Sequence, residues 1–241
     1  NNIDINFAKQ KGITVTNTPD PVVAPTADLT IGLLLALTRR IAELDHKLRS
    51  HKLEGWGLMD NLGFSLQNKV LGIIGMGNIG KAVAKRANAF GMKVIYNNRN
   101  RINADLEREL NVTYASFVNL IGASDFISIH TPLTAETTNL ISIGELMLMQ
   151  NSAMIINTSR GKVIDEEALV YALQFGEISG AALDVFANEP EIHPELLKLP
   201  NTVVVPHIGT GTLEARVEIG LQAADNILAF FSGKKVPNRV A

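Results

Sequence analysis

A glycine-rich turn between a strand-like and a helix-like segment limits the fold of this chain more than any other feature. In LGIIGMGNIGKAVAKRANAFGMKVIYN, Gly75, Gly77 and Gly80 follow an apolar run and open a helical pattern over residues 78–90, and a second apolar run comes next. Such a G-x-G-x-x-G turn lets the backbone approach a pyrophosphate and lets the helix pack on the strand. The segment therefore predicts a dinucleotide-binding unit in which the N–H groups of Asn78 and Ile79 face the phosphates.

The rest of the chain continues this alternation of short apolar runs and helical patterns. Further apolar runs are DFISIH, AMIINTS, GAALDVF and TVVVPH, and helical patterns cover residues 104–110 and 166–175. Short strands separated by helices are typical of a parallel sheet that is covered on both faces. We therefore predict an α/β fold with a doubly wound parallel sheet of the Rossmann type.

A long helical pattern over residues 26–48 precedes the glycine-rich turn. Its apolar side chains recur at three- and four-residue steps, Thr26 is placed to cap it, and Asp28 suits its first turn. Because IGLLLAL is apolar on almost all sides, we expect this helix to be covered by two domains of one chain or by a second copy. The following GWGLMDNLGFSLQN is interpreted as an arm over a partner subunit. A final helix is predicted over Leu213–Phe231.

Composition removes several other classes of protein. The chain has 241 residues, no cysteine and a net charge of -2, so it has neither a thiolate nucleophile nor the basic surface of a nucleic-acid-binding protein. Its densest apolar run, residues 31–37, is too short to cross a membrane. No H-E-x-x-H or Cys/His spacing indicates a metal site. We expect a cytoplasmic protein that acts on a small molecule and holds no metal.

The end of the second predicted strand, VIYNNRNRI, indicates which dinucleotide binds. An acidic residue about 20 positions after the turn normally accepts hydrogen bonds from the adenosine ribose. This chain has Asn98 near that position, no acidic residue before Asp105, and Arg99 and Arg101 in between. A guanidinium suits the 2′-phosphate that distinguishes NADP from NAD. We therefore predict that NADP(H) is preferred over NAD(H) and is held by Asn98 and Arg99, with Arg101 as a second candidate.

Three later segments end predicted strands at the edge of the sheet where such folds bind ligands. They are INTSRGKVIDEEAL with Arg160, GAALDVFANEP with Asp184 and Glu189, and VVVPHIGTGT with His207. Together with HTPLTAETTNLI and the glycine-rich turn, these segments resemble the D-isomer-specific 2-hydroxyacid dehydrogenases in order and spacing. The resemblance extends from NNIDINFAKQKGITVTNTP to the final helix. It implies a Rossmann domain accompanied by remnants of a second, flavodoxin-like domain.

The resemblance implies catalytic roles for three residues. Arg160 matches the arginine of a T-x-R-G motif that holds the substrate carboxylate and carbonyl, for which a planar guanidinium is better suited than an ammonium group. His207 matches the acid/base that protonates the carbonyl oxygen as hydride arrives. Glu189 matches the acid that orients this imidazole and favours its charged form. By residue type alone, Arg160 would be interpreted as one partner of a structural ion pair, His207 as a core histidine and Glu189 as a helix-capping acid.

The same resemblance extends the cofactor site beyond the glycine-rich turn. Beside the nicotinamide it implies four residues, the first of which bonds the carboxamide: Asp184, Thr158, Ser159 and Gly209. Over the adenosine and the phosphates it implies a loop with two residues: Pro132 and Thr137. Thr210 and Gly211 depart from the Ser and Ala of the family motif. Neither carries a chemical group of the mechanism, so these departures affect only the expected shape of the loop.

The expected domain boundaries follow from the resemblance. Residues 1–22 correspond to a remnant of the substrate domain, residues 23–210 to the NAD(P)-binding domain, and residues 211–241 to a helix that returns to the substrate domain. Residues 19–25 and 206–211 are the expected hinges. The family places further substrate-domain strands and a Val-Gly loop upstream of the residues that NNID matches. We therefore expect this segment alone to be inactive.

The predicted function is the transfer of a hydride between NADP(H) and a small 2-keto or 2-hydroxy acid, with no nucleic-acid or membrane partner. The NNRNR sequence resembles the glyoxylate and hydroxypyruvate reductase branch of the family. A homodimer through the helix over residues 26–48 and the arm is the expected assembly. Two alternatives stay open: an NAD-dependent 2-hydroxyacid dehydrogenase, and a dinucleotide-sensing corepressor that keeps the same triad without turnover.

Overall fold

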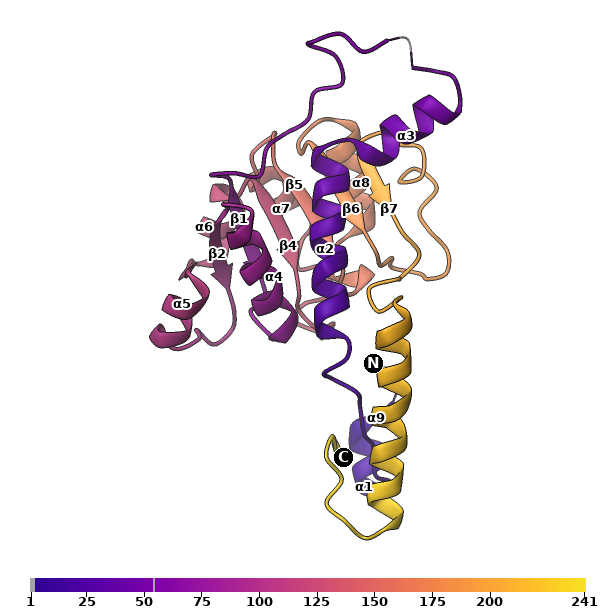
Figure 1. Cartoon of the computed structure of the whole chain (residues 1–241). Coiled ribbons are helices and arrows are strands. Elements are labelled where there is room, and N and C mark those ends of the chain that lie inside the picture. Colours follow the sequence, from indigo (N-terminus) through magenta and orange to yellow (C-terminus); the bar gives the residue numbers. More distant parts are fainter. Residues whose placement is uncertain (1–2, 54) are drawn as a thin grey trace.

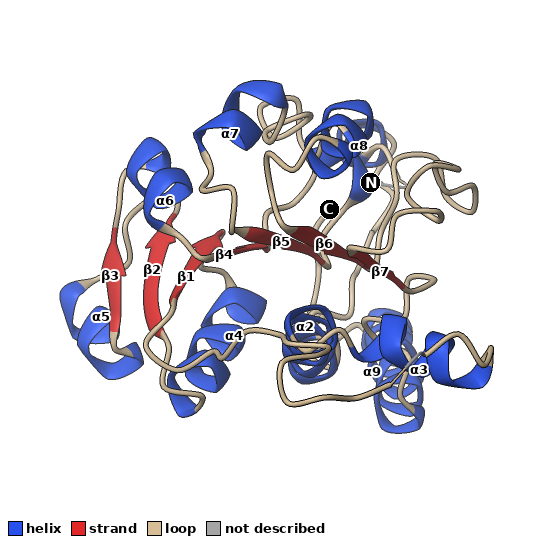
Figure 2. Ribbon diagram, turned by 90° about the horizontal axis from the view of Figure 1, so that it is seen from above, coloured by secondary structure: helices blue, strands red, loops and turns tan. Residues whose placement is uncertain are grey.

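The computed structural model describes residues 3–53 and 55–241, and its centre is a parallel sheet of seven strands. The strand order is β3-β2-β1-β4-β5-β6-β7, and every pair of neighbouring strands is parallel. The strands are β1 (Val70–Ile74), β2 (Lys93–Asn97), β3 (Val112–Tyr114), β4 (Phe126–Ile129), β5 (Met154–Asn157), β6 (Gly180–Leu183) and β7 (Thr202–Val204). Helices cover both faces of the sheet (Figure 2), which confirms the predicted doubly wound α/β fold.

The helices form one layer on each face of the sheet. The first layer holds α2 (Val23–Thr38), α4 (Asn78–Ala89) and α5 (Ala104–Leu110), and the second holds α6 (Phe117–Ala123), α7 (Ile143–Leu148) and α8 (Glu166–Gln174). Buried side chains fill the two spaces, with Leu34 and Ile73 in the first and Ile127 and Leu169 in the second. Because β4, β5 and β6 are buried on both faces, they have the nearly continuous apolar sequences from which they were predicted.

Three short elements were not anticipated from the sequence. They are β3, α6 and α7, none longer than seven residues. The sequence signals for the two helices were their caps. The side chain of Ser116 accepts a hydrogen bond from the backbone N–H of Asn119, and Ser142 and Glu145 form a capping box. Elements this short show too little periodicity to stand out from a loop.

The prediction of one helix over residues 26–48 was wrong. The chain forms two helices, α2 and α3 (Ile41–Arg49), separated at Arg40, whose φ of 55° is left-handed. At this break the carbonyl oxygen of Thr38 accepts a hydrogen bond from Phe64 of the arm, and the guanidinium of Arg40 bonds Glu43. A long-range backbone contact therefore ends α2.

None of the described helices is long and apolar enough to cross a membrane.

The predicted cap of α2 was also wrong. The helix begins at Val23 with Val22 as its N-cap, and no side chain caps it. Thr26 lies inside the helix and is buried, and its hydroxyl donates to the carbonyl oxygen of Gly209. Asp28 forms an ion pair with Arg86 of α4. Both residues thus contact segments that are distant in the sequence.

The two ends of the chain lie together, away from the sheet. Helices α1 (Ile5–Gln10) and α9 (Leu213–Phe231) both lie below the sheet in Figure 1. An antiparallel bridge pairs Thr16 with Arg239, and the buried Asn226 of α9 donates to the carbonyl oxygen of Asn17. Residues 3–22 and 211–241 are therefore neighbours in space, whereas the part of the NNID interpretation that concerns residues 1 and 2 falls outside the described residues.

Candidate active site and cofactor cleft

The glycine-rich turn has the shape that a pyrophosphate requires. Gly75 has a φ of 100°, and a Cβ atom there would lie 2.6 Å from the carbonyl oxygen of His130. A Cβ atom at Gly80 would overlap the carbonyl oxygen of Gly75. At Gly77, the N-cap of α4, a Cβ atom would meet nothing within 4 Å, and no side chain caps the helix. The first N–H groups of α4, including those of Asn78 and Ile79, thus border open space, which fits an anionic group.

A small cavity continues from this turn toward Arg160. Its volume is about 190 Å³, and its walls are formed by the start of α4 and the ends of β4 and β5: Ile79, His130, Thr131, Pro132, Leu133, Thr158, Ser159 and Arg160. The hydroxyl of Thr131 is buried here and has no hydrogen-bond partner among the described residues. A buried hydroxyl without a partner is costly in an empty cavity and useful beside a polar ligand. Thr131 had not been singled out from the sequence, because only its burial distinguishes it.

The three residues after β2 lie in different surroundings. Asn98 accepts a hydrogen bond from Met76 of the turn at 3.4 Å, so its amide lies beside the glycine-rich loop. Arg99 is exposed. A hydrogen bond with Thr134 is the main cause that lowers the pKa of Glu136, and the charge of Arg99 lowers it further. Arg99 is therefore close enough to the loop over residues 132–137 to lower the pKa of Glu136.

Arg101, the second candidate ligand of the 2′-phosphate, forms an ion pair with Glu107, and its role as a ligand stays a prediction. Its guanidinium bonds both oxygens of Glu107, at 2.8 and 2.7 Å, and lies over the ring of Tyr114. The hydroxyl of the buried Tyr96 donates to the same carboxylate. The hydrogen bonds from Arg101 and Tyr96 lower the pKa of Glu107 to about 2, so this carboxylate is ionised at neutral pH. The pair uses Nε and Nη2 of Arg101, and the other N–H groups of this 61% exposed side chain have no part in it.

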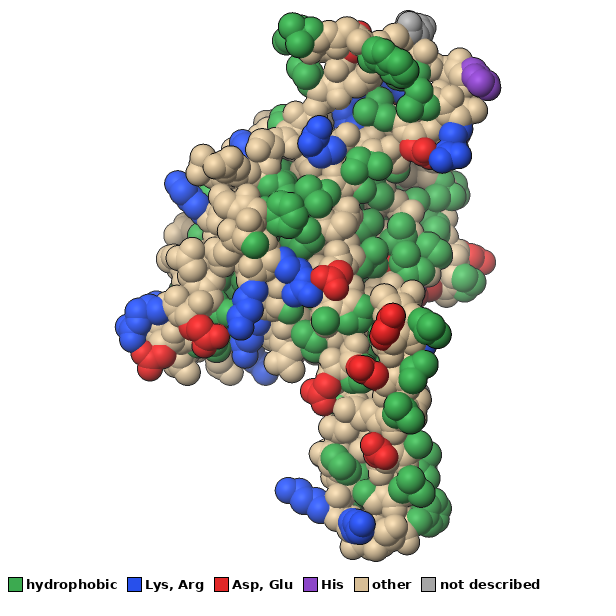
Figure 3. Space-filling view, viewed as in Figure 1, with side chains coloured by type: hydrophobic (Ala, Val, Ile, Leu, Met, Phe, Trp, Pro, Cys, Tyr) green, Lys and Arg blue, Asp and Glu red, His purple; other side chains and the backbone are tan. Residues whose placement is uncertain are grey.

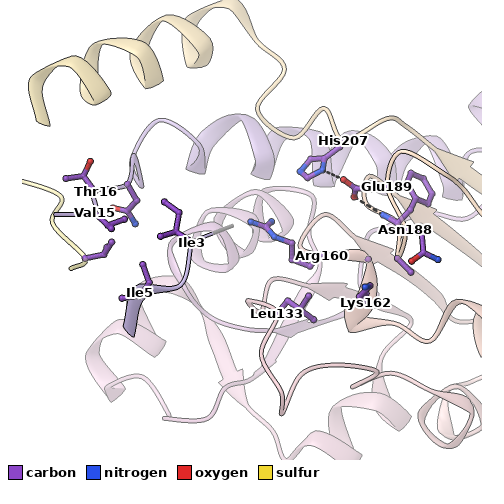
Figure 4. A pocket seen from close by; sticks show the side chains of 15 residues that line it. Ile3, Ile5, Val15, Thr16, Leu133, Arg160, Lys162, Asn188, Glu189 and His207 are labelled. Atoms are coloured by element: carbon purple, nitrogen blue, oxygen red, sulfur yellow. Dashed lines mark hydrogen bonds and ion pairs between the residues drawn. The ribbon is translucent and has the colours of Figure 1, made fainter. Parts of the chain in front are cut away.

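His207 and Glu189 form a hydrogen-bonded pair at the carboxyl edge of the sheet. The distance between Nδ1 of His207 and Oε2 of Glu189 is 2.7 Å, and Oε1 of Glu189 accepts from the N–H of Phe186 (Figure 4). Burial acts to raise the pKa of Glu189, but the hydrogen bond with His207 and the amide of Phe186 together outweigh it, and the pKa is lowered. Because an ionised carboxylate only accepts, Nδ1 carries the proton and Nε2 remains for other partners.

Arg160 faces the same cleft as this pair. The cleft has a volume of about 1020 Å³ and lies between the ends of β5, β6 and β7 on one side and the N-terminal segment on the other. Figure 4 shows Arg160, Glu189 and His207 pointing into it, opposite Ile3, Ile5 and Val15. A Cβ atom at Gly161 would overlap the backbone of Phe186, so this glycine lets the Arg160 segment pack against the strand that leads to Glu189. The three predicted catalytic residues are therefore brought together.

Asp184 holds the loop that carries His207. The residue is 1% exposed, its Oδ1 accepts from the N–H of Ile208 at 2.6 Å, and its Oδ2 accepts from the N–H of Gly209 at 2.8 Å. Burial raises the pKa of Asp184 in spite of these two hydrogen bonds. Each carboxylate oxygen has a second lone pair, so both contacts leave room for a further donor. Sequence reasoning had not anticipated this contact of Asp184 with the loop.

Of the remaining predicted cofactor residues, Pro132, Thr158 and Ser159 line the smaller cavity. The buried hydroxyls of Thr158 and Ser159 bond Thr30 and Asn157, and the hydroxyl of Thr137 donates to the carbonyl oxygen of Pro132. His193 bonds Glu167 at 3.1 Å, outside the residues that line the 1020 Å³ cleft. In the described part of the chain, no group of three or more His, Asp or Glu side chains is arranged to hold a metal ion.

Comparison with known proteins assigns the chain to a family. Residues 31–209 match the model of the D-isomer specific 2-hydroxyacid dehydrogenase, NAD binding domain. The chain belongs to the D-isomer-specific 2-hydroxyacid dehydrogenases. It is 49% identical to a glyoxylate reductase of Thermococcus litoralis and 45% identical to one of Aeropyrum pernix, and it aligns over 99% of its own length with 73% and 72% of theirs.

Solved structures of other dehydrogenases in this family have the same fold. An NADPH-dependent glyoxylate/hydroxypyruvate reductase from Sinorhizobium meliloti, solved with NADP and malonate, is 35% identical with a TM-score of 0.91; the alignment covers 99% of this chain and 74% of that one. A D-lactate dehydrogenase from Lactobacillus jensenii, solved with NAD+, is 29% identical with a TM-score of 0.87, over 99% and 75% of the two chains. The chain is thus an oxidoreductase that uses a nicotinamide dinucleotide. The alternative of a dinucleotide-sensing corepressor is not favoured by these relatives.

Proposed function

We propose that this dehydrogenase reduces small 2-keto acids of the glyoxylate and hydroxypyruvate type with NADPH, and that Arg160, Glu189 and His207 are its catalytic residues. The observation that carries the proposal is the arrangement of the His207–Glu189 pair and Arg160 in one cleft next to the glycine-rich turn. The names of the relatives, several of which are glyoxylate reductases, support the same substrate class.

The mechanism assigns a separate task to each of the three residues. The guanidinium of Arg160 binds the substrate carboxylate through two parallel hydrogen bonds and so fixes the keto group in one orientation. NADPH, when bound, would be the source of the hydride for the carbonyl carbon. Nε2 of protonated His207 donates its proton to the carbonyl oxygen, which removes the charge that would otherwise build up there. Glu189, ionised because its pKa is lowered, holds Nδ1–H and stabilises the imidazolium.

The cofactor assignments follow the geometry of the two cavities. We assign the pyrophosphate to the turn formed by Gly75, Gly77, Asn78, Ile79 and Gly80. The nicotinamide end is assigned to a second group of residues: Thr158, Ser159, Asp184, His207 and Gly209. Pro132 and Thr137 are assigned to the adenosine side of the loop. Thr131 joins these assignments, since the residue lines the connecting cavity and its buried hydroxyl has no partner among the described residues.

The catalytic assignment is tested by replacing His207 in the whole enzyme, because residues 1–241 alone are expected to be inactive. In His207→Ala we expect kcat for glyoxylate reduction to fall by about 10²- to 10⁴-fold, because the proton donor is lost, while the dissociation constant of NADPH changes little. Steady-state kinetics and fluorescence titration of NADPH measure the two quantities. His193→Ala is the matched control, since that histidine lies outside the cleft, and it should keep the parent kcat. An equal loss of turnover and NADPH affinity in His207→Ala would contradict the role as acid.

The preference for NADP(H) rests on Asn98 and on Arg99, which lies near the loop over residues 132–137. A neutral amide at position 98 does not repel a 2′-phosphate, and an exposed guanidinium can bind one. In Arg99→Ala we expect the affinity for NADPH to fall by about tenfold and that for NADH to stay unchanged. Arg101→Ala is the control, because its guanidinium is held by Glu107, and it should lower thermal stability without changing the preference. A parent protein that already prefers NADH would contradict this proposal.

The proposed assembly is a homodimer through α2, α3 and the arm over residues 55–68. The arm exposes large apolar side chains that a solitary subunit rarely leaves in water: Trp56, Leu58, Met59, Leu62 and Phe64. Figure 3 shows this apolar group at the end of the molecule farthest from α9.

We further propose that residues 3–22 and 211–241 belong to the substrate lobe and residues 23–210 to the dinucleotide lobe. A cytoplasmic location is part of the same proposal.

A further inference from the structure

Three threonines of α2 are buried, and two of them reach other segments: Thr30 contacts the hydroxyl of Thr158 at 3.0 Å, and Thr26 contacts the loop that carries His207. Thr30 and Thr38 donate their hydroxyls to the carbonyl oxygens four residues earlier, Thr26 and Leu34, each at 2.8 Å. This is the ordinary way in which a buried threonine is satisfied inside a helix. The hydroxyl of Thr26, in contrast, donates to the carbonyl oxygen of Gly209 at 3.2 Å, across 183 residues of sequence.

Gly209 is held on two sides by elements that are independent of each other. Its N–H donates to Oδ2 of Asp184 at the end of β6, and its carbonyl oxygen accepts from Thr26 of α2. A Cβ atom at Gly209 would lie 3.1 Å from the carboxylate of Asp184 and 3.3 Å from the hydroxyl of Thr26. Because glycine has no Cβ atom, the carboxylate of Asp184 and the hydroxyl of Thr26 can both approach residue 209 closely enough to form their hydrogen bonds.

The loop needs this support because it carries a residue in an unfavourable conformation. His207 has a φ of 52°, in the left-handed region that non-glycine residues seldom adopt. Such a conformation persists only where the surrounding structure holds it. His207 itself bonds Val205 through its N–H and Glu189 through its ring. The contacts that reach the following residues from other elements include those of Asp184 with the N–H groups of Ile208 and Gly209, and that of Thr26 with the carbonyl oxygen of Gly209.

We propose that Thr26 is a positioning residue for His207: from α2, its hydroxyl holds the loop that aims the imidazole into the cleft. The inference rests on the proposed role of His207 as proton donor. It assigns the first turns of α2 to the catalytic apparatus, although no side chain of α2 lines the 1020 Å³ cleft. Proton transfer depends on donor position within fractions of an ångström, so loss of one anchor lowers the rate without removing a reacting group.

The test compares Thr26→Val with Thr26→Ser in the whole protein. Valine keeps the shape and removes the hydrogen bond, and we expect kcat for glyoxylate reduction to fall about fivefold to tenfold while the KM for NADPH stays within about twofold. Serine keeps the hydroxyl and should restore kcat. Thr38→Val is the matched control, because the buried hydroxyl of Thr38 bonds, among the described residues, the carbonyl oxygens of Leu34 and Leu35 in the same helix. This variant should keep the parent kcat.

A second measurement does not depend on turnover. NMR signals of the His207 side chain, identified by their loss in His207→Gln, should move in Thr26→Val, while those of His193 stay in place. Parent values of kcat and of the His207 signals in Thr26→Val would overturn the proposal, as would an equal fall of kcat in Thr38→Val. If the parent protein shows no turnover, the proposed function fails, and the NMR comparison still decides the role of Thr26.

Discussion

At the scale of single residues, ionisation states follow from hydrogen-bond partners. Glu189 accepts from His207 and from the amide of Phe186, and its lowered pKa keeps it charged at neutral pH. The charged carboxylate in turn places the proton of His207 on Nδ1 and leaves Nε2 for the substrate. His130, at the end of β4, has the opposite environment. Burial lowers its pKa to about 4, and its Nε2 bonds the hydroxyl of Ser128 at 2.8 Å.

The lowered pKa of His130 predicts an acid sensitivity of the fold. Because the ordinary value is 6.5, the unfolded chain binds a proton between about pH 6.5 and 4 that the folded protein does not. The contribution of neutral His130 to stability is therefore present above pH 6.5 and is lost as the pH falls toward 4. In His130→Gln we expect the melting temperature, measured by circular dichroism, to decline less steeply over this range. His193→Gln should keep the parent slope, and identical slopes for all three proteins would contradict the prediction.

At the scale of secondary-structure elements, contacts between distant segments decide where helices begin, end and lie. Helix α2 stops where Thr38 accepts a hydrogen bond from the arm. Helix α9 leaves the sheet and exposes an apolar stripe along its length: Leu213, Val217, Leu221, Leu228 and Phe231. Figure 3 shows apolar side chains along this helix. Inside α9, Asn226 is 1% exposed and joins both ends of the chain.

Asn226 gives a prediction about how α9 holds the terminal segments. Its side chain donates to the carbonyl oxygen of Asn17 at 3.1 Å and accepts from the N–H of Asn238 at 3.3 Å. Asn226→Leu leaves both backbone groups without their partner, at a cost of about 1–3 kcal/mol each if they stay buried. We expect faster hydrogen exchange in residues 13–17 and 236–241 and unchanged exchange in β1 and β4–β6. Glu218→Leu, an exposed change on the same helix, should alter neither, and uniform acceleration in Asn226→Leu would refute local opening.

At the scale of the whole molecule, function depends on two groups of segments that meet at the cleft. The sheet supplies Arg160, Glu189 and His207, and the terminal segments supply the opposite wall with Ile3, Ile5 and Val15. The connections between them run through residues 19–25 and 206–211, so the His207 loop is also a connection between the two groups. The arm over residues 55–68 extends to the other end of the molecule (Figure 1), remote from the cleft.

The proposed dimer makes a prediction about the arm. Leu58 is 94% exposed, and a carboxylate in its place would be costly in an apolar interface. We expect the parent to sediment with twice the mass of the 26.1 kDa chain and Leu58→Asp to shift toward the monomer at micromolar concentration in analytical ultracentrifugation. Leu197→Asp is the control, because Leu197 is exposed on a loop far along the chain from the arm. A parent that sediments as a monomer would disprove the proposed assembly.

Much of the fold was predictable because its signals are local. The long apolar runs of β1, β2, β4, β5, β6 and β7 and the helices α4, α5, α8 and α9 were all anticipated close to their observed bounds. Gly75 and Gly80 were assigned correctly to a tight turn and a close packing contact, since space for a side chain is lacking at both positions. The catalytic assignments came from resemblance, and the structure adds that the three side chains share one cleft.

The sequence by itself therefore determined the parallel sheet, the glycine-rich turn and the residue types available for chemistry, because periodicity and backbone freedom act over a few neighbouring residues. Only the tertiary structure decided the break at Arg40, the commitment of Arg101 to Glu107, and the contacts of Asp184 and Thr26 with the His207 loop. The break and both contacts with the loop depend on partners from distant parts of the chain. Arg101 and Glu107 are only six residues apart, but one lies in the loop before α5 and the other inside α5, so their contact depends on how that loop joins the helix. Hydrogen bonds and ion pairs of this kind form after the elements have packed, so no local pattern records them.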